Sequence, residues 1–360
     1  MHLGIPALLD FYRTHAAEDS LVLVTIIATE GSTYRKPGAM MLISRDDSFE
    51  GMISGGCLEG DLLHHAAEVF NSGQAKFVTY DMHAGDDLVW GLGLGCDGII
   101  RLMLKRLDCE HGFAFLEQLE ASHAARSAVL LALTTQSNGS LPLASFALLD
   151  RAGKTCGEVA LIGLLQDILH QGWPDWRYWK TCDTEKGQSG ETIVVNLPPQ
   201  TRVLVCGAGP DAIPVVRALC ALDWDVHIVD HRPAYARVDR FPDKCRMIQA
   251  RPERLAEFVN LDEFDAAVVM SHHLENDSIY LAQLAKKDLV YLGCLGPRAR
   301  RDRLRKMAGC PDREVFGPVG LDIGAELPAA IALSLVAEIH AVLNRRSGLS
   351  LTPAPKHETD

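Results

Sequence analysis

The chain has 360 residues, of which 48% are hydrophobic and 23% are charged, so it is long enough for two hydrophobic cores and we expect two domains. Its 35 Lys and Arg residues against 47 Asp and Glu residues give a net charge of −12, which argues against general binding to nucleic acid or to anionic membranes. The sequence shows no basic leader and no run of about 18 apolar residues, so we expect a cytoplasmic protein that does not enter the membrane.

The first half of the chain mixes helical and strand patterns. Apolar spacing predicts helices over residues 6–15, 59–71 and 112–123, and strands over residues 21–28, 39–44, 76–80, 99–104, 127–134, 145–149 and 191–196. Turn-forming residues fill positions 30–38, a loop that also contains the cations Arg35 and Lys36. These patterns favour a mixed α+β domain.

Two glycine-rich loops of this half each contain a cysteine. Cys57 follows Gly55 and Gly56, and Cys96 follows a run that includes Gly93 and Gly95. Such loops bring backbone N–H groups close to a ligand, and they can bind an anion or hold a thiol as thiolate. The ten cysteines are otherwise scattered without a Cys-x-x-Cys pair, so we expect reduced thiols and no closed zinc site.

The junction between the two halves is placed from composition. Residues 180–190 are polar and contain glycine, and two prolines follow at positions 198 and 199. We therefore expect one domain over residues 1–197 and a second over residues 198–350, with a disordered tail over residues 351–360.

The second half has the pattern of a Rossmann-like, doubly wound parallel sheet. Short apolar strands are predicted over residues 202–206, 226–230, 246–249, 266–270 and 289–293. Gly207 and Gly209 follow the first strand and Asp230 closes the second, as in loops that bind a dinucleotide. Asp211 would place a carboxylate beside the pyrophosphate, so the loop either binds a phosphate-bearing ligand or only makes the turn from strand to helix.

Further candidate residues in this half follow predicted strands or precede a helix. His272 follows the fourth strand, where a neutral imidazole can bind a ligand or carry a proton. Gly296 and Arg298 follow the fifth strand, and Arg298 is a candidate phosphate ligand at a helix start. Asp322 and Glu326 precede an apolar helix over residues 329–343; they either accept hydrogen bonds from a ligand or, for Glu326, cap the helix.

Several motifs of both halves occur together and in order. They are TEGSTYRKPGAM over residues 29–40, SGGCLEG over 54–60, YD over 80–81, WGLGLGC over 90–96, VLVCGAG over 203–209, VMSH over 269–272, YLGCLGPR over 291–298 and GLDIGAELP over 320–328. The chain thereby resembles the XdhC/CoxI family, the maturation factors of xanthine dehydrogenase and related molybdenum hydroxylases.

The resemblance implies a chaperone more than a catalyst. It implies a protein that binds molybdenum cofactor, works with a cysteine desulfurase while the cofactor is sulfurated, and delivers it to an apo molybdenum hydroxylase. It also implies an N-terminal XdhC/CoxI domain, a C-terminal Rossmann domain and self-association, for which we expect a homodimer.

The residue chemistry suits such a cargo, which carries a phosphate, a flat pterin and a soft metal site. Cys57 or Cys96 would be the soft sulfur ligand of molybdenum or a persulfide carrier. Arg35 would neutralise the phosphate, and Glu59 would either orient a pterin donor or cap the helix that begins there.

Two other classes of function stay open at this point. One is an NAD(P)-dependent oxidoreductase that holds the dinucleotide in the second half of the chain. The carboxylate of Asp211 argues against this reading. The other is a sensor or scaffold that binds a nucleotide and docks a partner, in which both cysteine loops are structural.

Overall fold

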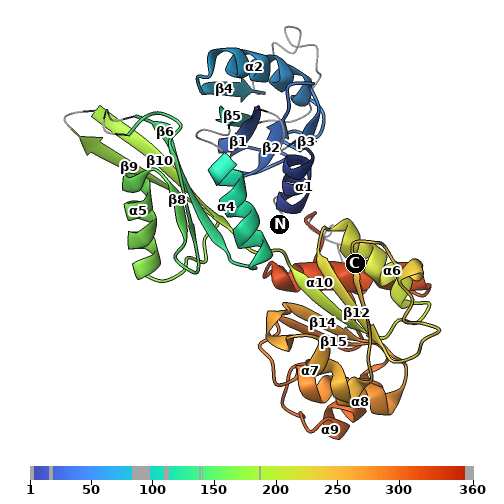
Figure 1. Ribbon diagram of the computed structural model, residues 1–360. Helices are drawn as coiled ribbons and strands as arrows, with labels where there is room; N and C mark the ends of the chain where they lie inside the picture. The colour runs from blue at the N-terminus through green and yellow to red at the C-terminus, as the bar shows by residue number, and fades with distance from the viewer. Residues whose placement is uncertain are drawn as a thin grey trace, which may run out of the picture. The chain divides into compact units, whose positions relative to one another are not determined.

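A computed structural model describes residues 4–15, 19–82, 98–108, 113–137, 139, 141–185 and 188–352. The chain divides into two compact units, one ending at Pro199 and one beginning at Gln200 (Figure 1). Among the described residues, no helix is both long and apolar enough to span a membrane.

The N-terminal unit contains two antiparallel five-stranded sheets. The first sheet has the strand order β3-β2-β1-β5-β4 and the second the order β8-β7-β6-β10-β9. The first is built from β1 (Ser20–Gly31), β2 (Met40–Ile43), β3 (Phe49–Gly51), β4 (Lys76–Asp81) and β5 (Gly98–Asp108). The second is built from β6 (Val129–Gln136), β7 (Phe146–Asp150), β8 (Thr155–Gly157), β9 (Tyr178–Glu185) and β10 (Gln188–Leu197).

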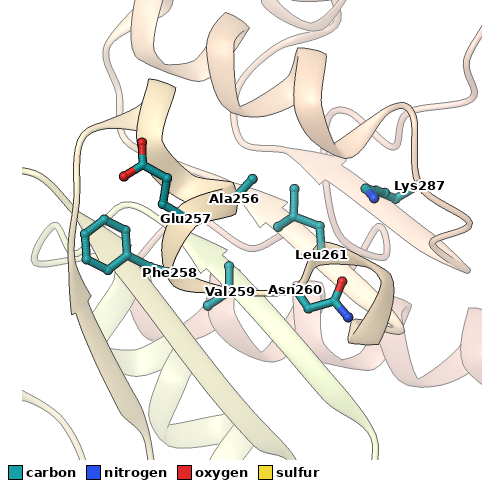
Figure 2. Close-up of a pocket in the computed structure, with 7 residues that line it drawn as sticks. All are labelled: Ala256, Glu257, Phe258, Val259, Asn260, Leu261 and Lys287. Atoms are coloured by element: carbon teal, nitrogen blue, oxygen red, sulfur yellow. The ribbon is translucent and has the colours of Figure 1, made fainter.

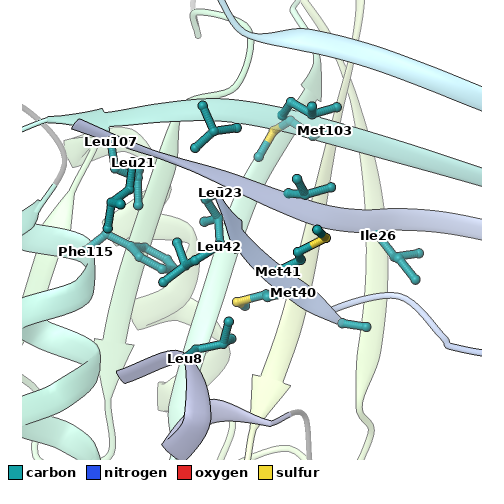
Figure 3. Close-up of a cluster of buried hydrophobic side chains, with 14 of the residues drawn as sticks. Leu8, Leu21, Leu23, Ile26, Met40, Met41, Leu42, Met103, Leu107 and Phe115 are labelled. Atoms are coloured by element: carbon teal, nitrogen blue, oxygen red, sulfur yellow. The ribbon is translucent and has the colours of Figure 1, made fainter. Parts of the chain in front are cut away.

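In the described part of this unit, four helices pack on the sheets: α1 (Ile5–His15), α2 (Glu59–Ser72), α4 (Phe113–Ala124) and α5 (Val159–His170). One large core joins the first sheet, α1, α2 and α4 to one face of the second sheet, and Figure 3 shows its methionine and leucine side chains. Phe115 of α4 meets Phe146 of β7 edge to face, with ring centroids 5.4 Å apart. The opposite face of the second sheet packs on α5. The central strand β1 is buried throughout its first eight residues by this core.

The C-terminal unit is a parallel five-stranded sheet with the order β13-β12-β11-β14-β15. Its strands are β11 (Arg202–Cys206), β12 (Asp225–Asp230), β13 (Arg246–Gln249), β14 (Ala266–Val269) and β15 (Tyr291–Cys294). Helices α6 (Ala212–Ala221) and α10 (Pro328–Leu343) cover one face; α7 (Leu255–Phe258), α8 (Leu274–Leu284) and α9 (Arg298–Met307) cover the other (Figure 1).

Alternate residues of the central strands divide between these two layers. Val203 and Val205 belong to the core beneath α6 and α10, whereas Leu204 and Cys206 belong to the core beneath α7 to α9. Burial on both faces explains why the strands are continuous apolar runs. The expected fold class is confirmed: a mixed α+β first half and a Rossmann-like second half.

Part of the first half differs from expectation. The composition of residues 180–190 predicts a connecting segment, but these residues contribute to β9 and β10, which pair antiparallel with Val194 opposite Trp179. The sequence patterns also do not predict strands β3 and β8 or helix α5. The tail from residue 353 onward and the glycine loop with Gly93, Gly95 and Cys96 lie outside the described residues.

Candidate functional site

Several loops of the N-terminal unit leave the same end of its first sheet. β1 ends at Gly31 opposite Gly98, the first residue of β5, and β4 ends at Asp81 opposite Ile99. β2 and β3 pair at this end too, with Met41 opposite Gly51. The loop with Arg35 and the loop with Cys57 therefore both begin at this end of the sheet. β4 ends here and β5 begins here, on either side of residues 83–97.

The loop with Cys57 is held by one buried carboxylate. Glu59, the first residue of α2, is 5% exposed, and its oxygens accept hydrogen bonds from the donors that precede it. These donors are the N–H groups of Ile53 (3.0 Å), Ser54 (2.9 Å), Gly56 (3.0 Å) and Leu58 (3.2 Å), and the Ser54 hydroxyl (2.6 Å). Burial raises the pKa of Glu59, but these hydrogen bonds outweigh it and the net shift is downward.

This geometry assigns Glu59 a role that the sequence reasoning missed. The capping position of α2 is Leu58, which makes no side-chain cap, and the Glu59 oxygens are used by the loop itself. Glu59 is thus the organiser of the loop. The only sequence signal was its position three residues after Gly56.

The two glycines of this loop leave room for a ligand above the backbone. Gly55 and Gly56 have φ of 90° and 110°, values that favour glycine. Among the described residues, a Cβ atom at Gly56 would meet nothing within 4 Å, whereas one at Gly55 would lie 3.7 Å from the Tyr34 ring. Cys57 is exposed, and its N–H donates to the Ser54 hydroxyl over 3.1 Å. The thiol is therefore presented on an ordered backbone.

The loop with Arg35 lies against the glycine loop through Tyr34. Within it, the Thr33 hydroxyl donates to the Arg35 carbonyl over 3.0 Å and accepts from the Lys36 ammonium over 3.2 Å. The Arg35 side chain is half-buried, and burial lowers its pKa. Among the described residues, no carboxylate pairs with its guanidinium. Arg35 is thus a partly desolvated cation suited to an anionic ligand.

A line of polar side chains runs along α2, the helix that follows the Cys57 loop. Tyr80 of β4 donates its hydroxyl to Asp61 over 2.6 Å, and Asp61 lies 3.3 Å from His65 Nε2. His65 Nδ1 lies 2.8 Å from the Lys76 ammonium, which also pairs with Glu68 over 2.6 Å. Lysine can only donate, so this arrangement favours the His65 tautomer that carries its proton on Nε2. Sequence reasoning did not find this line.

The C-terminal unit has a second group of candidate residues, at the carboxyl ends of β11, β12 and β14. Gly207 packs so closely on the chain after β14 that a Cβ atom would lie 2.6 Å from the Met270 carbonyl oxygen. The Asp230 carboxylate is buried and accepts from the Ala208 N–H over 2.8 Å and from the Arg232 guanidinium over 2.7 Å. Its oxygens are therefore occupied by the protein, where a dinucleotide would need them for ribose.

His272 faces the glycine turn from the neighbouring strand. Its Nε2 lies 2.7 Å from the Asp211 carboxylate, and its φ of 61° is unusual for a side chain of this size. Asp211 also lies over Gly209, where an added Cβ would be 2.6 Å from its Oδ1 atom. A carboxylate thus occupies the space above the turn where a pyrophosphate would lie.

The arginines of α9 differ in whether they face solvent or hydrogen-bond to the rest of the protein. Arg298 is exposed, whereas Arg300 reaches the buried Asp277 over 2.6 Å and Arg301 donates to the Gly317 carbonyl over 2.8 Å. Gly296, with φ of 121°, leaves the space that the Arg300 side chain occupies. Of this cluster, we retain only Arg298 as a candidate ligand.

The remaining candidates lie in the loop before α10. Asp322 and Glu326 are both exposed, and the capping position of α10 is Leu327, which makes no side-chain cap. The loop is anchored by other groups: Gly320 donates to Glu338 over 2.9 Å, and Tyr291 donates to the same oxygen over 2.6 Å. Capping by Glu326 is therefore not what holds the helix start.

A shallow pocket of about 470 Å³ lies elsewhere in the C-terminal unit (Figure 2). It is lined by residues 256–261, which precede β14 in the chain, and by Lys287, which follows α8. None of the predicted site residues lines it. Within the described part of the chain, no three His, Cys, Asp or Glu side chains are arranged to hold a metal ion.

Comparison with known proteins covers both units. Residues 14–81 match the family model described as "XdhC and CoxI family", and residues 203–339 match that of the "XdhC Rossmann domain". A Bacillus subtilis protein, named as a probable subunit of xanthine dehydrogenase, is 32% identical over 331 residues, which cover 89% of this chain and 93% of that protein.

Two further matches extend over most of the chain. The Escherichia coli "Molybdenum cofactor insertion chaperone PaoD" is 24% identical over 342 residues, or 92% of this chain and 87% of that protein. A crystal structure from Bacillus halodurans, described as a xanthine dehydrogenase, is 30% identical and superposes with a TM-score of 0.78 over 98% of both chains. The matched ranges include the Cys57 loop and the turn after β11.

Proposed function

Because this chain belongs to the XdhC and CoxI family, we propose that it is a maturation chaperone that binds molybdenum cofactor and delivers it to an apo molybdenum hydroxylase of the xanthine dehydrogenase type. The name of the PaoD relative supports this cargo. The proposal includes cooperation with a cysteine desulfurase during sulfuration, a homodimer and a cytoplasmic location.

The observation that carries the proposal is the half-buried Arg35, in a loop whose Tyr34 ring lies against the glycine backbone beside Cys57. A half-buried guanidinium without a carboxylate partner among the described residues has lost water and gained no counterion in return. Tyr34 links its loop to Gly55, and no other described residue places an atom within 4 Å of the Cβ position of Gly56, its chain neighbours aside. An anion with a flat body, such as the phosphate and pterin of the cofactor, suits this arrangement.

We assign the residues of this site as follows. Arg35 binds the cofactor phosphate, and the backbone of Gly55 and Gly56 approaches the pterin. Cys57 supplies a thiol to the metal or carries the persulfide sulfur, and Cys96 is the second candidate for this role. Glu59 holds the loop in shape without touching the cargo.

For the C-terminal unit we propose a supporting role in this delivery, with Arg298, Asp322 and Glu326 as exposed contacts. The alternative, an NAD(P)-dependent oxidoreductase, is opposed by two features. Asp211 lies over Gly209, and the Asp230 oxygens are held by Ala208 and Arg232. The Asp211 carboxylate places negative charge where the phosphates of a dinucleotide would bind. The Asp230 oxygens already accept hydrogen bonds from the protein where the ribose would need them.

The test is anaerobic equilibrium binding of molybdenum cofactor to the full chain and to the Arg35→Gln and Cys57→Ala variants. Loss of one charge-assisted contact should weaken binding about tenfold in Arg35→Gln. Arg13→Gln is the matched control, because Arg13 already pairs with Asp10 and Glu120 on the surface. NAD and NADP are titrated in parallel.

The outcomes separate the candidate functions. Cofactor binding that weakens in Arg35→Gln but not in Arg13→Gln supports the chaperone. A protein that ignores the cofactor and binds a dinucleotide would favour the oxidoreductase. Activation of an apo hydroxylase that survives the Cys57→Ala and Cys96→Ala double substitution would favour a scaffold with structural cysteine loops.

A further inference from the structure

The second sheet of the N-terminal unit contains none of the predicted site residues, yet two of its side chains reach the ends of the loop with Arg35. Tyr178 of β9 and Val195 of β10 lie directly opposite each other in the antiparallel pairing of these strands. Opposite residues of such a pair point to the same face of a sheet. Both side chains pack in the core that joins this sheet to the first one.

Tyr178 acts at an irregularity of β1, before the loop begins. The pairing of β1 with β5 shifts register between Ile26 and Ala28, so Ile27 is skipped in the register. Such a bulge withdraws the backbone groups of the extra residue from the ladder of strand hydrogen bonds. The Tyr178 hydroxyl donates to the Ile27 carbonyl oxygen over 3.0 Å. A side chain of the second sheet thus provides the hydrogen bond that the bulge carbonyl needs.

Val195 acts at the other end of the same loop. Gly38 donates its N–H to the Ile26 carbonyl over 2.8 Å, and the Ile26 N–H donates to the Ala39 carbonyl over 2.9 Å. These two bonds close the base of the loop. A Cβ atom at Gly38 would clash with the Cγ1 atom of Val195. β10 therefore packs directly on the loop base, with no room for a side chain between them.

We propose that Tyr178 is a positioning residue for the cofactor site: with Val195 beside it, it fixes both ends of the loop and thereby the place of the Arg35 guanidinium. Neither side chain touches the cargo itself. The inference rests on the proposed function, in which Arg35 binds the cofactor phosphate. A charged group binds well only when neighbouring residues hold it at the right place, and a small displacement weakens the contact.

The first test is a double-mutant cycle on cofactor affinity in the full chain, with Tyr178→Phe, Arg35→Gln and both substitutions together. Phenylalanine keeps the ring and removes only the hydroxyl that donates to the Ile27 carbonyl. We expect Tyr178→Phe to weaken cofactor binding about threefold when Arg35 is present. In the Arg35→Gln protein it should have no effect, because Tyr178 acts through that guanidinium.

Thr135→Val is the matched control for this cycle. The Thr135 hydroxyl donates to Glu191 over 2.7 Å, so the substitution removes a hydroxyl from a different contact of the same sheet. Cofactor affinity should stay close to that of the parent protein. Thermal unfolding of each variant shows that it is folded. An unchanged affinity in Tyr178→Phe, or a loss just as large in the Arg35→Gln protein, would overturn the proposal.

A second test needs no cofactor. Trypsin cuts after arginine, and the bond between Arg35 and Lys36 lies in the loop. Cleavage of a folded protein at such a bond depends on how often the segment opens. Tyr178→Phe should raise the cleavage rate at Arg35 about threefold. Cleavage after the exposed Arg151, in the turn between β7 and β8, should stay the same, and Thr135→Val should change neither rate.

The two tests separate this inference from the proposed function. A parent protein that does not bind the cofactor would contradict the proposed function, and the cleavage rates would still decide whether Tyr178 positions the loop. Equal cleavage at Arg35 in the parent and in Tyr178→Phe would overturn the positioning role. Faster cleavage at Arg35 and Arg151 alike would show a general loss of stability and would overturn it too.

Discussion

Ser54 and Glu59 hold each other in the loop that presents Cys57. The Ser54 hydroxyl donates to the Glu59 carboxylate over 2.6 Å and accepts the N–H groups of Cys57 and Leu58 over 3.1 and 2.8 Å. The carboxylate in turn accepts the Ser54 N–H. The position of the thiol therefore depends on a buried carboxylate at the start of α2.

Glu59→Gln should destabilise the N-terminal unit by about 1–3 kcal/mol, because the new amide group would face N–H donors and leave them unpaired. Urea unfolding followed by circular dichroism measures this change. Glu117→Gln, at an exposed position of α4, is the control and should change the free energy of unfolding by less than about 0.5 kcal/mol. Equal effects of the two substitutions would contradict the role given to Glu59.

The stability of the C-terminal unit should fall in acid through Asp225. Burial alone would raise the pKa of Asp225, but hydrogen bonds from His227 and Arg202 outweigh it and lower the pKa from 3.8 to about 2. A lowered folded-state pKa gives stability above pH 3.8 that is lost as the pH falls toward 2. Because the carboxylate is partly exposed and solvent screens its ion pairs, the loss should be about 1–2 kcal/mol.

Asp225→Asn is the variant that tests this pH dependence. It should be less stable than the parent at neutral pH, and the difference should shrink between about pH 4 and pH 2 when urea unfolding is measured at each pH. A difference that stays constant over this range would show that Asp225 does not titrate as proposed.

Gly207→Ala and Gly209→Ala should differ although the two glycines share one turn. Gly207 has φ of 122°, and its added Cβ would lie 2.6 Å from a backbone oxygen, so we expect a loss of about 2–4 kcal/mol. At Gly209 the one clash of the new Cβ with a described residue would be with the Asp211 carboxylate, a side-chain group that can turn aside, so the loss should stay below about 1 kcal/mol. Thermal unfolding of both variants checks this order.

Arg35→Gln should separate stability from binding. Because Arg35 has no ion-pair partner among the described residues, its replacement should leave the unfolding free energy within about 0.5 kcal/mol of the parent, while cofactor affinity falls. Replacing an arginine with a purely structural role would instead lower the free energy of unfolding and leave the cofactor affinity unchanged. Urea unfolding and cofactor titration on the same preparations distinguish the two.

The second half could be predicted closely from the sequence. Its central strands are buried on both faces, so they appear as short apolar runs, and the predicted ranges of all five strands differ from the observed ones by at most two residues at either end. The second sheet of the N-terminal unit was harder. β9 has the sequence YWKTCDTE, an edge strand with polar side chains, and only its pairing with β10 reveals it.

The candidate site could be predicted only in its local part. The glycines beside Cys57 and the cation Arg35 are visible as sequence features. The contact of Tyr34 with Gly55, and the line from Tyr80 to Asp61, join segments that are distant in the chain. Such contacts depend on strand register, which a single sequence does not provide.

Gly98 limits how this end of the first sheet can be redesigned. A Cβ atom there would lie 2.6 Å from the carbonyl oxygens of both Glu30 and Ser32. Every other amino acid would therefore push β5 away from the end of β1, from which the Arg35 loop starts. New loops can therefore be grafted at this end of the sheet only if position 98 keeps its glycine.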